Sequence, residues 1–264
     1  MDAVYIATPA KTHFQVVSDS LKAGKDVLVE KPMVTSVKEA EELVDLDEKL
    51  NRILMVSHTF LYNDAIRKMR SIVIIGDLGS IEHVYSRRTN LGPWIMDVDV
   101  LWDIGPHDIA ILRYLLGEDP ESISLIGASD LKGLPGVCFV NLTFGTGVVG
   151  SIHLSWFDFY KTRTVTVVGS KSMVACSDYA DREKARLQVQ PYYISGRKLL
   201  KEQLSVAEID VSRTLENEVT HFLQCIKERQ LPLTNCFEGL SVTRILEHGE
   251  KSMRNNGAWE KIAW

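Results

Sequence analysis

The chain has 264 residues, 45% of them hydrophobic and 25% charged, which is typical of a soluble globular protein with a buried core. Its net charge of −5 argues against a nucleic-acid-binding protein, because phosphate contacts need a basic surface. The sequence shows no apolar run long enough to span a bilayer, no secretory signal and no close metal-ligand spacing of its four cysteines, so we expect a cytoplasmic protein without membrane or nucleic-acid partners.

Residues 1–58 predict a parallel α/β unit. Helical patterns separate three apolar runs that are typical of buried strands, at residues 3–7, 26–29 and 53–56. Thr12 is expected to cap the first helix, and Gly24 suits the left-handed position past its end. Ser36 and Glu39 form a capping box before a second helix that runs to about residue 50. Alternating strands and helices predict a parallel sheet, here a partial Rossmann-like sheet that lacks its first strands.

Residues 59–264 predict a second domain of a different kind. Strand patterns at residues 80–91 and 121–175 are joined by short turns, which connect antiparallel strands. Helical patterns follow or interrupt them at about residues 106–116, 213–229 and 237–254. The predicted fold class is therefore α/β plus α+β, with an open, mostly antiparallel sheet that carries helices on one face.

Lys31 is the first candidate for chemistry. It follows a buried strand in the sequence Glu30-Lys31-Pro32, so it is expected at the carboxyl edge of the parallel sheet, where open α/β sheets bind ligands. Pro32 favours an extended backbone at Lys31. A lysine held there can hydrogen-bond a substrate hydroxyl, although the tripeptide alone fits a surface lysine in a turn better.

Asp103 and His107 form the second candidate site. They are four residues apart, before and at the start of the helical pattern at 106–116, and Pro106 suits the first turn of a helix. If Asp103 caps this helix, its carboxylate lies near the imidazole of His107, which can accept a proton at physiological pH. Taken alone, the pair fits a helix cap and a first-turn polar residue better.

Together, these motifs resemble the Gfo/Idh/MocA family of oxidoreductases. The matching stretches occur in the family's order and cover nearly the whole chain: residues 2–9 with His13, residues 23–32, and residues 102–108. The resemblance implies that Lys31, Asp103 and His107 are the catalytic residues. It also implies that five residues line the nicotinamide side of a cleft for NAD or NADP: Ala7, Thr8, Pro9, His13 and Glu30.

A narrower resemblance concerns the substrate. Residues 57–63, 90–92 and 167–171 are similar to family members that oxidise UDP-linked N-acetylated sugars or their uronic acids, usually at C3 of the sugar. This implies four candidates for the substrate pocket, each of which also fits a structural role: Arg88, Asn90, Trp156 and Arg163. Arginine can hold a diphosphate or carboxylate with two hydrogen bonds, and tryptophan can cover a sugar or base.

The sequence departs from the family pattern at its start. Family members begin with a strand, a glycine-rich G-x-G-x-x-G turn and a helix that receives the pyrophosphate. Gly76 and Gly79 are taken as the nearest glycine pair, with the wrong spacing. At roughly 30 residues per βαβ unit, this departure predicts that about 60 residues are absent before Met1. A start codon placed too late is favoured over a shortened chain or a decayed remnant, and the chain as written is expected to be weakly active or inactive.

Two other functions compete with the dehydrogenase. The alternative is a non-catalytic binding or oligomerisation protein derived from the same family. Apolar residues at both parities of the strand 148–157 suit a sheet covered on both sides, so a homo-oligomer (dimer or tetramer) is expected in either case. The pair His107-Asp108 weakly suggests a metal-dependent phosphohydrolase, but His83, His153 and His248 lack a ligand-like spacing.

Overall fold

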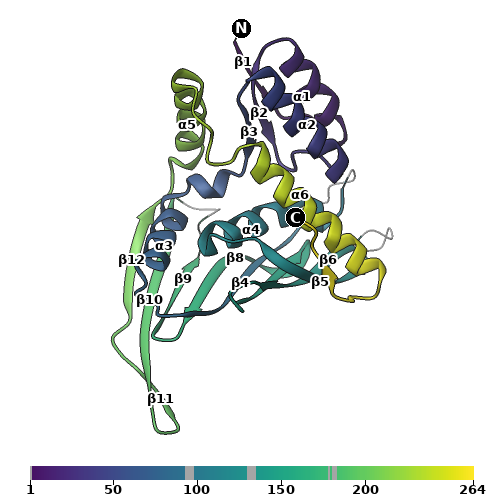
Figure 1. Cartoon of the computed structure of the whole chain (residues 1–264). Helices are drawn as coiled ribbons and strands as arrows, with labels where there is room; N and C mark the ends of the chain where they lie inside the picture. Colours follow the sequence, from purple (N-terminus) through teal and green to yellow (C-terminus); the bar gives the residue numbers. More distant parts are fainter. Residues whose placement is uncertain (1, 93–97, 130–134, 178, 180–182) are drawn as a thin grey trace.

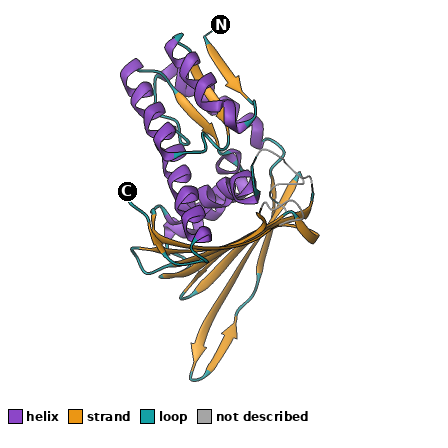
Figure 2. Cartoon of the chain, turned by 90° about the vertical axis from the view of Figure 1, so that its right-hand side faces the viewer, coloured by secondary structure: helices purple, strands orange, loops and turns teal. Residues whose placement is uncertain are grey.

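The structure, a computed structural model, describes residues 2–92, 98–129, 135–177, 179 and 183–264. It contains two β-sheets, a small one near the N-terminus and a large one that forms the base of the molecule (Figure 1). Helices lie against the small sheet and on one face of the large sheet (Figure 2). The predicted fold class is therefore confirmed.

The small sheet is fully parallel. Its strands are β1 (Ala3–Ile6), β2 (Asp26–Glu30) and β3 (Leu54–Ser57), in that order across the sheet. The helices α1 (His13–Lys22) and α2 (Val37–Leu50) connect the strands and pack on one face, where Val27 and Val29 are buried. The helix α5 (Thr214–Glu228) packs on the other face, where its Phe222 joins Leu28 and Met55 in a second apolar cluster.

Local sequence signals explain most of these boundaries. The hydroxyl of Ser36 accepts a hydrogen bond from the backbone N–H of Glu39 (3.2 Å), and Gly24 has a φ of +73°, as expected. The expected cap at Thr12 is wrong. Thr12 ends a 3₁₀ turn (Ala10–Thr12) with a helix-like backbone, and its hydroxyl bonds back to Thr8 (2.7 Å) and Pro9 (2.8 Å).

The large sheet has ten strands. Their order is β11-β10-β9-β8-β4-β7-β6-β5-β13, with β12 paired to β10. Among the described strands, β4 and β7 form a parallel pair and the other pairs are antiparallel, which confirms the mostly antiparallel sheet. The bounds are β4 (Ile81–Leu91), β5 (Pro120–Ser129), β6 (Pro135–Phe144), β7 (Val149–Ser155), β8 (Phe157–Gly169), β9 (Ser172–Ser177), β10 (Lys184–Ser195), β11 (Lys198–Lys201), β12 (Ser205–Asp210) and β13 (Glu260–Lys261).

One face of the large sheet is covered by helices and the other is open (Figure 2). The covering helices are α3 (Asp64–Ile75), α4 (Val100–Leu116) and α6 (Cys236–Arg254). Along β7 and the residues beside it, Ile152 and Leu154 are buried beneath α4 and α6, whereas Val149 and Phe157 are 48% and 43% exposed. The sequence predicts a strand that is covered on both faces. Within one chain, the helices cover one face of the large sheet, and the other face is exposed.

The helix α4 begins earlier than predicted. Asp99 caps it by accepting a hydrogen bond from the backbone N–H of Trp102 (3.0 Å), so Pro106 lies inside the helix. Pro106 has no N–H for the carbonyl of Trp102. Burial of the apolar residues at positions 100–102 offsets this loss. Asp103 therefore does not cap the helix, and it lies one turn before His107 on the same helix face. None of the helices in the described ranges is long and apolar enough to cross a membrane.

Candidate active site

Lys31 and Asp103 meet where the small sheet faces α4. The Nζ atom of Lys31 donates to Oδ1 of Asp103 (3.0 Å) and to its backbone carbonyl (2.6 Å). Both side chains are largely buried, with 18% and 10% of their surface exposed. Two segments 72 positions apart in sequence thus meet at the carboxyl edge of the parallel strands.

Trp156 holds the other oxygen of the same carboxylate. Its indole Nε1 donates to Oδ2 of Asp103 (3.1 Å), and Trp156 is itself buried. The carboxylate of Asp103 is therefore occupied at both oxygens. The expectation that Asp103 orients the imidazole of His107 is accordingly wrong, since no hydrogen bond joins the two side chains in the described part of the chain.

His107 points into the same region as a half-buried, neutral base. Its ring packs edge-on against the ring of Phe60, with centroids 4.8 Å apart. Burial, reinforced by the cations of Lys31 and Arg88, holds the pKa of His107 well below its ordinary value. The imidazole is therefore unprotonated near neutral pH, which is the form that can accept a proton.

A cleft of about 430 Å³ opens beside Asp103. Arg163 spans part of its wall by donating to Oδ1 of Asn90 (2.8 Å) and to the backbone carbonyl of Thr89 (2.8 Å). Three of the four residues predicted for the substrate pocket line this cleft. The lining residues are Asn90, Leu91, Gly92, Asp103, Ile104, Trp156, Phe159, Lys161 and Arg163.

Phe159 and Lys161 were not predicted. The alternation of side chains along a strand could have identified them, because Phe159, Lys161 and Arg163 lie at every second position of β8 and therefore on one face of the sheet. Once Arg163 is placed in a pocket, the residues two and four positions before it are expected on the same face.

Arg88 does not line the cleft, so its prediction as a substrate residue is corrected. Its Nε atom is ion-paired with Asp108, and Nη2 donates to the hydroxyl of Tyr179 (3.1 Å). The guanidinium also lies over the ring of Phe60, 4.6 Å from its centroid. Arg88 thus fastens α4 to β4. The same contact engages the carboxylate of Asp108 that the phosphohydrolase hypothesis needs.

The residues expected around the cofactor divide into two groups. Ala7, Thr8 and Pro9 are exposed in the loop after β1, and Glu30 ends β2. His13, in contrast, is 1% exposed, with Nδ1 bonded to the carbonyl of Pro32 (2.8 Å) and Nε2 to the carbonyl of Thr8 (2.8 Å). The expectation that His13 lines the cleft is therefore wrong: it braces two loops at the strand ends. The first group lies at the carboxyl ends of the parallel strands, the edge where open α/β sheets bind ligands.

The pyrophosphate end of a dinucleotide site needs a glycine-rich turn that is followed by a helix. The pattern G-x-G-x-x-G occurs at residues 145–150, so the choice of Gly76 and Gly79 as the nearest glycine pair is wrong. Residues 145–148 form the turn from β6 to β7, with Gly147 at a φ of +87°, and the last two residues of the motif begin β7, so a strand and not a helix follows the turn. A pyrophosphate needs a helix N-terminus after such a turn. The described residues therefore provide no glycine-rich pyrophosphate cradle.

Comparison with known proteins identifies the family. Residues 1–58 match the sequence model of the Gfo/Idh/MocA oxidoreductase family with an NAD-binding Rossmann fold, and residues 66–175 match the C-terminal domain of that family. The chain is 26% identical over 156 residues to UDP-N-acetylglucosamine 3-dehydrogenase of Acidithiobacillus ferrooxidans, covering 59% of this chain and 49% of that protein. It is 28% identical over 166 residues to 1,5-anhydro-D-fructose reductase of Ensifer adhaerens, covering 58% and 50%.

The matched segment thus spans about half the length of these two relatives. Among solved structures, an inositol dehydrogenase homologue of Azotobacter vinelandii, complexed with NADH and myo-inositol, superposes with a TM-score of 0.86 at 20% identity. The superposition covers 99% of this chain and 78% of that one, and it establishes the shared fold. With residues 1–58 and 66–175 matched by models of one family, the chain belongs to the Gfo/Idh/MocA oxidoreductases.

Proposed function

We propose that this protein is an NAD(P)-dependent oxidoreductase that acts on a hydroxyl group of a sugar. The observation that carries the proposal is the Lys31–Asp103 pair beside the neutral imidazole of His107, next to a cleft that Asp103 itself lines. This places a hydrogen-bond donor and a base near one pocket. We place the boundary between a cofactor domain and a substrate domain at residues 58 and 59.

Each side chain has a distinct role. The ammonium group of Lys31 donates two hydrogen bonds to Asp103, and its third N–H can donate to the substrate hydroxyl. This donation makes the hydroxyl more acidic. His107 takes the hydroxyl proton. Asp103 positions Lys31, and Trp156 positions Asp103. A bound nicotinamide supplies the hydride acceptor.

The cofactor site uses the strand ends. We propose that Ala7, Thr8, Pro9 and Glu30 contact the nicotinamide half of NAD or NADP, partly through backbone groups. The described residues contribute no glycine-rich cradle for the pyrophosphate, so we expect weak dinucleotide affinity and low activity for this chain.

A nucleotide-linked sugar fits the cleft better than a free sugar. Lys161 and Arg163 bring two positive charges to the lining, and these suit the phosphates of a nucleotide sugar or the carboxylate of a uronic acid. Phe159 is 90% exposed at the same cleft and offers a flat apolar surface for a base or sugar ring. The relative that acts on UDP-N-acetylglucosamine supports this class, and with it oxidation at C3.

The test combines binding and turnover. Calorimetry with UDP-N-acetylglucosamine, its uronic acid and free N-acetylglucosamine measures recognition in the cleft, and nicotinamide absorbance measures hydride transfer. Lys31→Met is expected to lower turnover by about 100-fold, the scale of a lost acid–base contribution. Lys38→Met, at an exposed position on α2, is the matched control and should retain full turnover. A chain that binds no sugar and ignores NAD and NADP would contradict the proposal.

The open face of the large sheet favours self-association. It exposes a set of apolar side chains: Tyr85, Ile126, Phe139, Val149 and Phe157. Apolar surface of this kind is usually covered by a partner. We propose a homo-oligomer formed through this face, and light scattering is expected to show a dimer or larger that Phe139→Glu weakens. If the chain proves catalytically inert, this surface supports the alternative of a non-catalytic assembly protein.

A further inference from the structure

The ring of the proposed base, His107, lacks the hydrogen bond that usually orients a catalytic histidine. Among the described residues, none forms a hydrogen bond with its buried Nδ1 atom. The nearby carboxylate of Asp103 is engaged by Lys31 at one oxygen and by Trp156 at the other. In most catalytic histidines, a hydrogen bond at the nitrogen that does not react fixes the ring. Another contact must therefore orient this imidazole.

Phe60 makes an aromatic contact with this ring. It lies in the 3₁₀ turn Thr59–Tyr62 that follows β3, and the centroid of its ring is 4.8 Å from that of the His107 ring, with an interplanar angle of 75°. Nearly perpendicular rings at this separation attract each other, because the positive edge of one ring meets the negative face of the other. The contact depends on direction, so it can orient the imidazole.

Two buried residues hold the ring of Phe60 in turn. The guanidinium of Arg88 lies over this ring, 4.6 Å from its centroid, and the ring of Tyr179 packs perpendicular to it, with centroids 5.5 Å apart. A cation over an aromatic face is attracted by the electrons of the ring. Nη2 of Arg88 also donates to the hydroxyl of Tyr179 (3.1 Å), so the two supports are joined to each other. Phe60 therefore has little freedom to turn.

These contacts form a closed chain that begins and ends on α4. Arg88 is ion-paired with Asp108, which directly follows His107 on that helix. The chain runs from His107 to Phe60, on to Arg88, and back to α4 at Asp108. The side chains of Arg88 and Asp108 are only 3% and 0% exposed. The support of the imidazole is therefore buried and fixed to the same helix as the imidazole itself.

We propose that Phe60 is a positioning residue: its ring, held by Arg88 and Tyr179, fixes the imidazole of His107 in the orientation that accepts the substrate proton. This inference rests on the proposed oxidoreductase function. It explains how a base without a carboxylate partner keeps one orientation. Because Phe60 is not among the residues that line the substrate cleft, we expect it to affect the transfer step and not the binding of the sugar.

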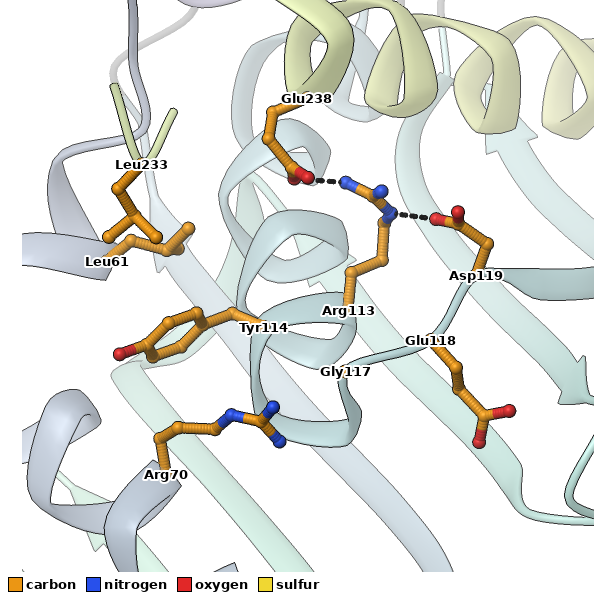
Figure 3. A pocket seen from close by; sticks show the side chains of 9 residues that line it. All are labelled: Leu61, Arg70, Arg113, Tyr114, Gly117, Glu118, Asp119, Leu233 and Glu238. Carbon is orange, nitrogen blue, oxygen red and sulfur yellow. Dashed lines mark hydrogen bonds and ion pairs between the residues drawn. The ribbon is translucent and has the colours of Figure 1, made fainter. Parts of the chain in front are cut away.

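The next side chain of the same turn provides a matched control. Leu61 is 2% exposed and lines a separate pocket of about 380 Å³ at the C-terminal end of α4. Figure 3 shows Leu61 in the wall of this pocket, which Tyr114 and Leu233 also line. Leu61→Val removes one methylene from a buried site and so loosens the packing of the turn, but it leaves the ring of Phe60 in place. It therefore separates a loss of packing from the loss of the ring contact.

The experiment compares three variants of the whole chain with the unmodified protein. Phe60→Leu removes the ring and keeps an apolar side chain, Phe60→Tyr keeps the ring, and Leu61→Val is the control. Nicotinamide absorbance gives kcat and KM separately. Three-bond NMR couplings give the χ1 rotamer of His107, and this measurement needs no turnover.

We expect Phe60→Leu to lower kcat by about 10- to 100-fold with little change in KM, because a misoriented base slows the proton transfer and leaves substrate binding intact. The side chain of His107 should then populate more than one χ1 rotamer. Phe60→Tyr and Leu61→Val should each keep a single rotamer of His107 and most of the turnover.

A single rotamer of His107 in Phe60→Leu would overturn the proposal. Full turnover in that variant, or an equal loss of turnover in Leu61→Val, would overturn it as well. If the unmodified chain shows no turnover, the proposed function fails, and the rotamers alone decide whether Phe60 orients the imidazole. If Phe60→Leu does not fold, Phe60→Met, which also lacks the ring, takes its place and is judged by the same outcomes.

Discussion

The indole N–H of Trp156 donates to Oδ2 of Asp103 at 3.1 Å, on the carboxylate whose Oδ1 accepts from Lys31. One buried residue from the large sheet therefore fixes the carboxylate that fixes the lysine of the small sheet. Trp156→Phe keeps the ring and removes this donor. Because a hydrogen bond to a charged group contributes about 1.5–3 kcal/mol, we expect at least a roughly tenfold loss of turnover.

The matched control for that change is Trp259→Phe, since Trp259 is 54% exposed. Circular dichroism of both variants should match the unmodified chain. Equal turnover in the two variants would show that Asp103 holds Lys31 without help from Trp156.

The buried Arg88–Asp108 pair is expected to stabilise the fold and to leave ligand binding untouched. Arg88→Leu leaves the carboxylate of Asp108 buried without its cation, which costs about 3–5 kcal/mol. Arg88→Leu combined with Asp108→Leu should recover most of this loss, because neither charge remains buried. Urea unfolding measures the free energies, and Lys184→Ala in the exposed pair with Glu208 should show no resolvable change. A single variant as stable as the double variant would contradict this account.

The sequence was informative where a signal is local. The apolar run 26–29 and Pro32 predict Lys31 at a strand end, where the structure has it. The spacing of four between Asp103 and His107 predicts that the two residues lie near each other, but Asp103 lies within α4 and does not cap it. The start of α4 was missed because Pro106 is a strong first-turn signal, and the burial of residues 100–102 outweighs it.

Long-range contacts were beyond local signals. No pattern in the sequence reveals that Trp156 donates to Asp103 across 53 positions, or that Arg88 turns toward Asp108 and away from the cleft. Both follow from the parallel pairing of β4 with β7 beneath α4. His13 illustrates the same limit, since its ring nitrogens are engaged by backbone carbonyls that only the fold brings together.

Glu218 makes stability depend on pH. Glu218 lies on α5, and its buried carboxylate accepts hydrogen bonds from the hydroxyls of Ser57 (3.3 Å) and Thr59 (3.2 Å). Burial raises its pKa from 4.5 to about 7, although those hydrogen bonds oppose the shift. The native state therefore binds the proton more tightly than the unfolded chain. The stabilisation, on the order of 3 kcal/mol, is complete below pH 4.5 and is lost as the pH rises through about 7.

Glu218→Gln keeps the shape and removes the titration, so its unfolding free energy should vary less between pH 5 and 8 than that of the unmodified chain. Glu216→Gln, at an exposed site on the same helix, is the control. His58 and His107 act in the opposite direction, because their lowered pKa values destabilise the fold as the pH falls below about 6.5. The difference between the two glutamine variants isolates Glu218 from this background.

Lys31 is expected to control the protonation of His107. Burial is the largest cause of the lowered pKa of His107, and the Lys31 cation is the next. Lys31→Met removes that cation, so the pKa of His107 should rise and yet remain below 6.5. NMR titration of the histidine resonances measures it, with Lys38→Met as the control. Since the base must be neutral to accept a proton, turnover of the unmodified chain should also persist to a pH well below 6.5. An acid limb at or above that value would mean that a different group takes the proton.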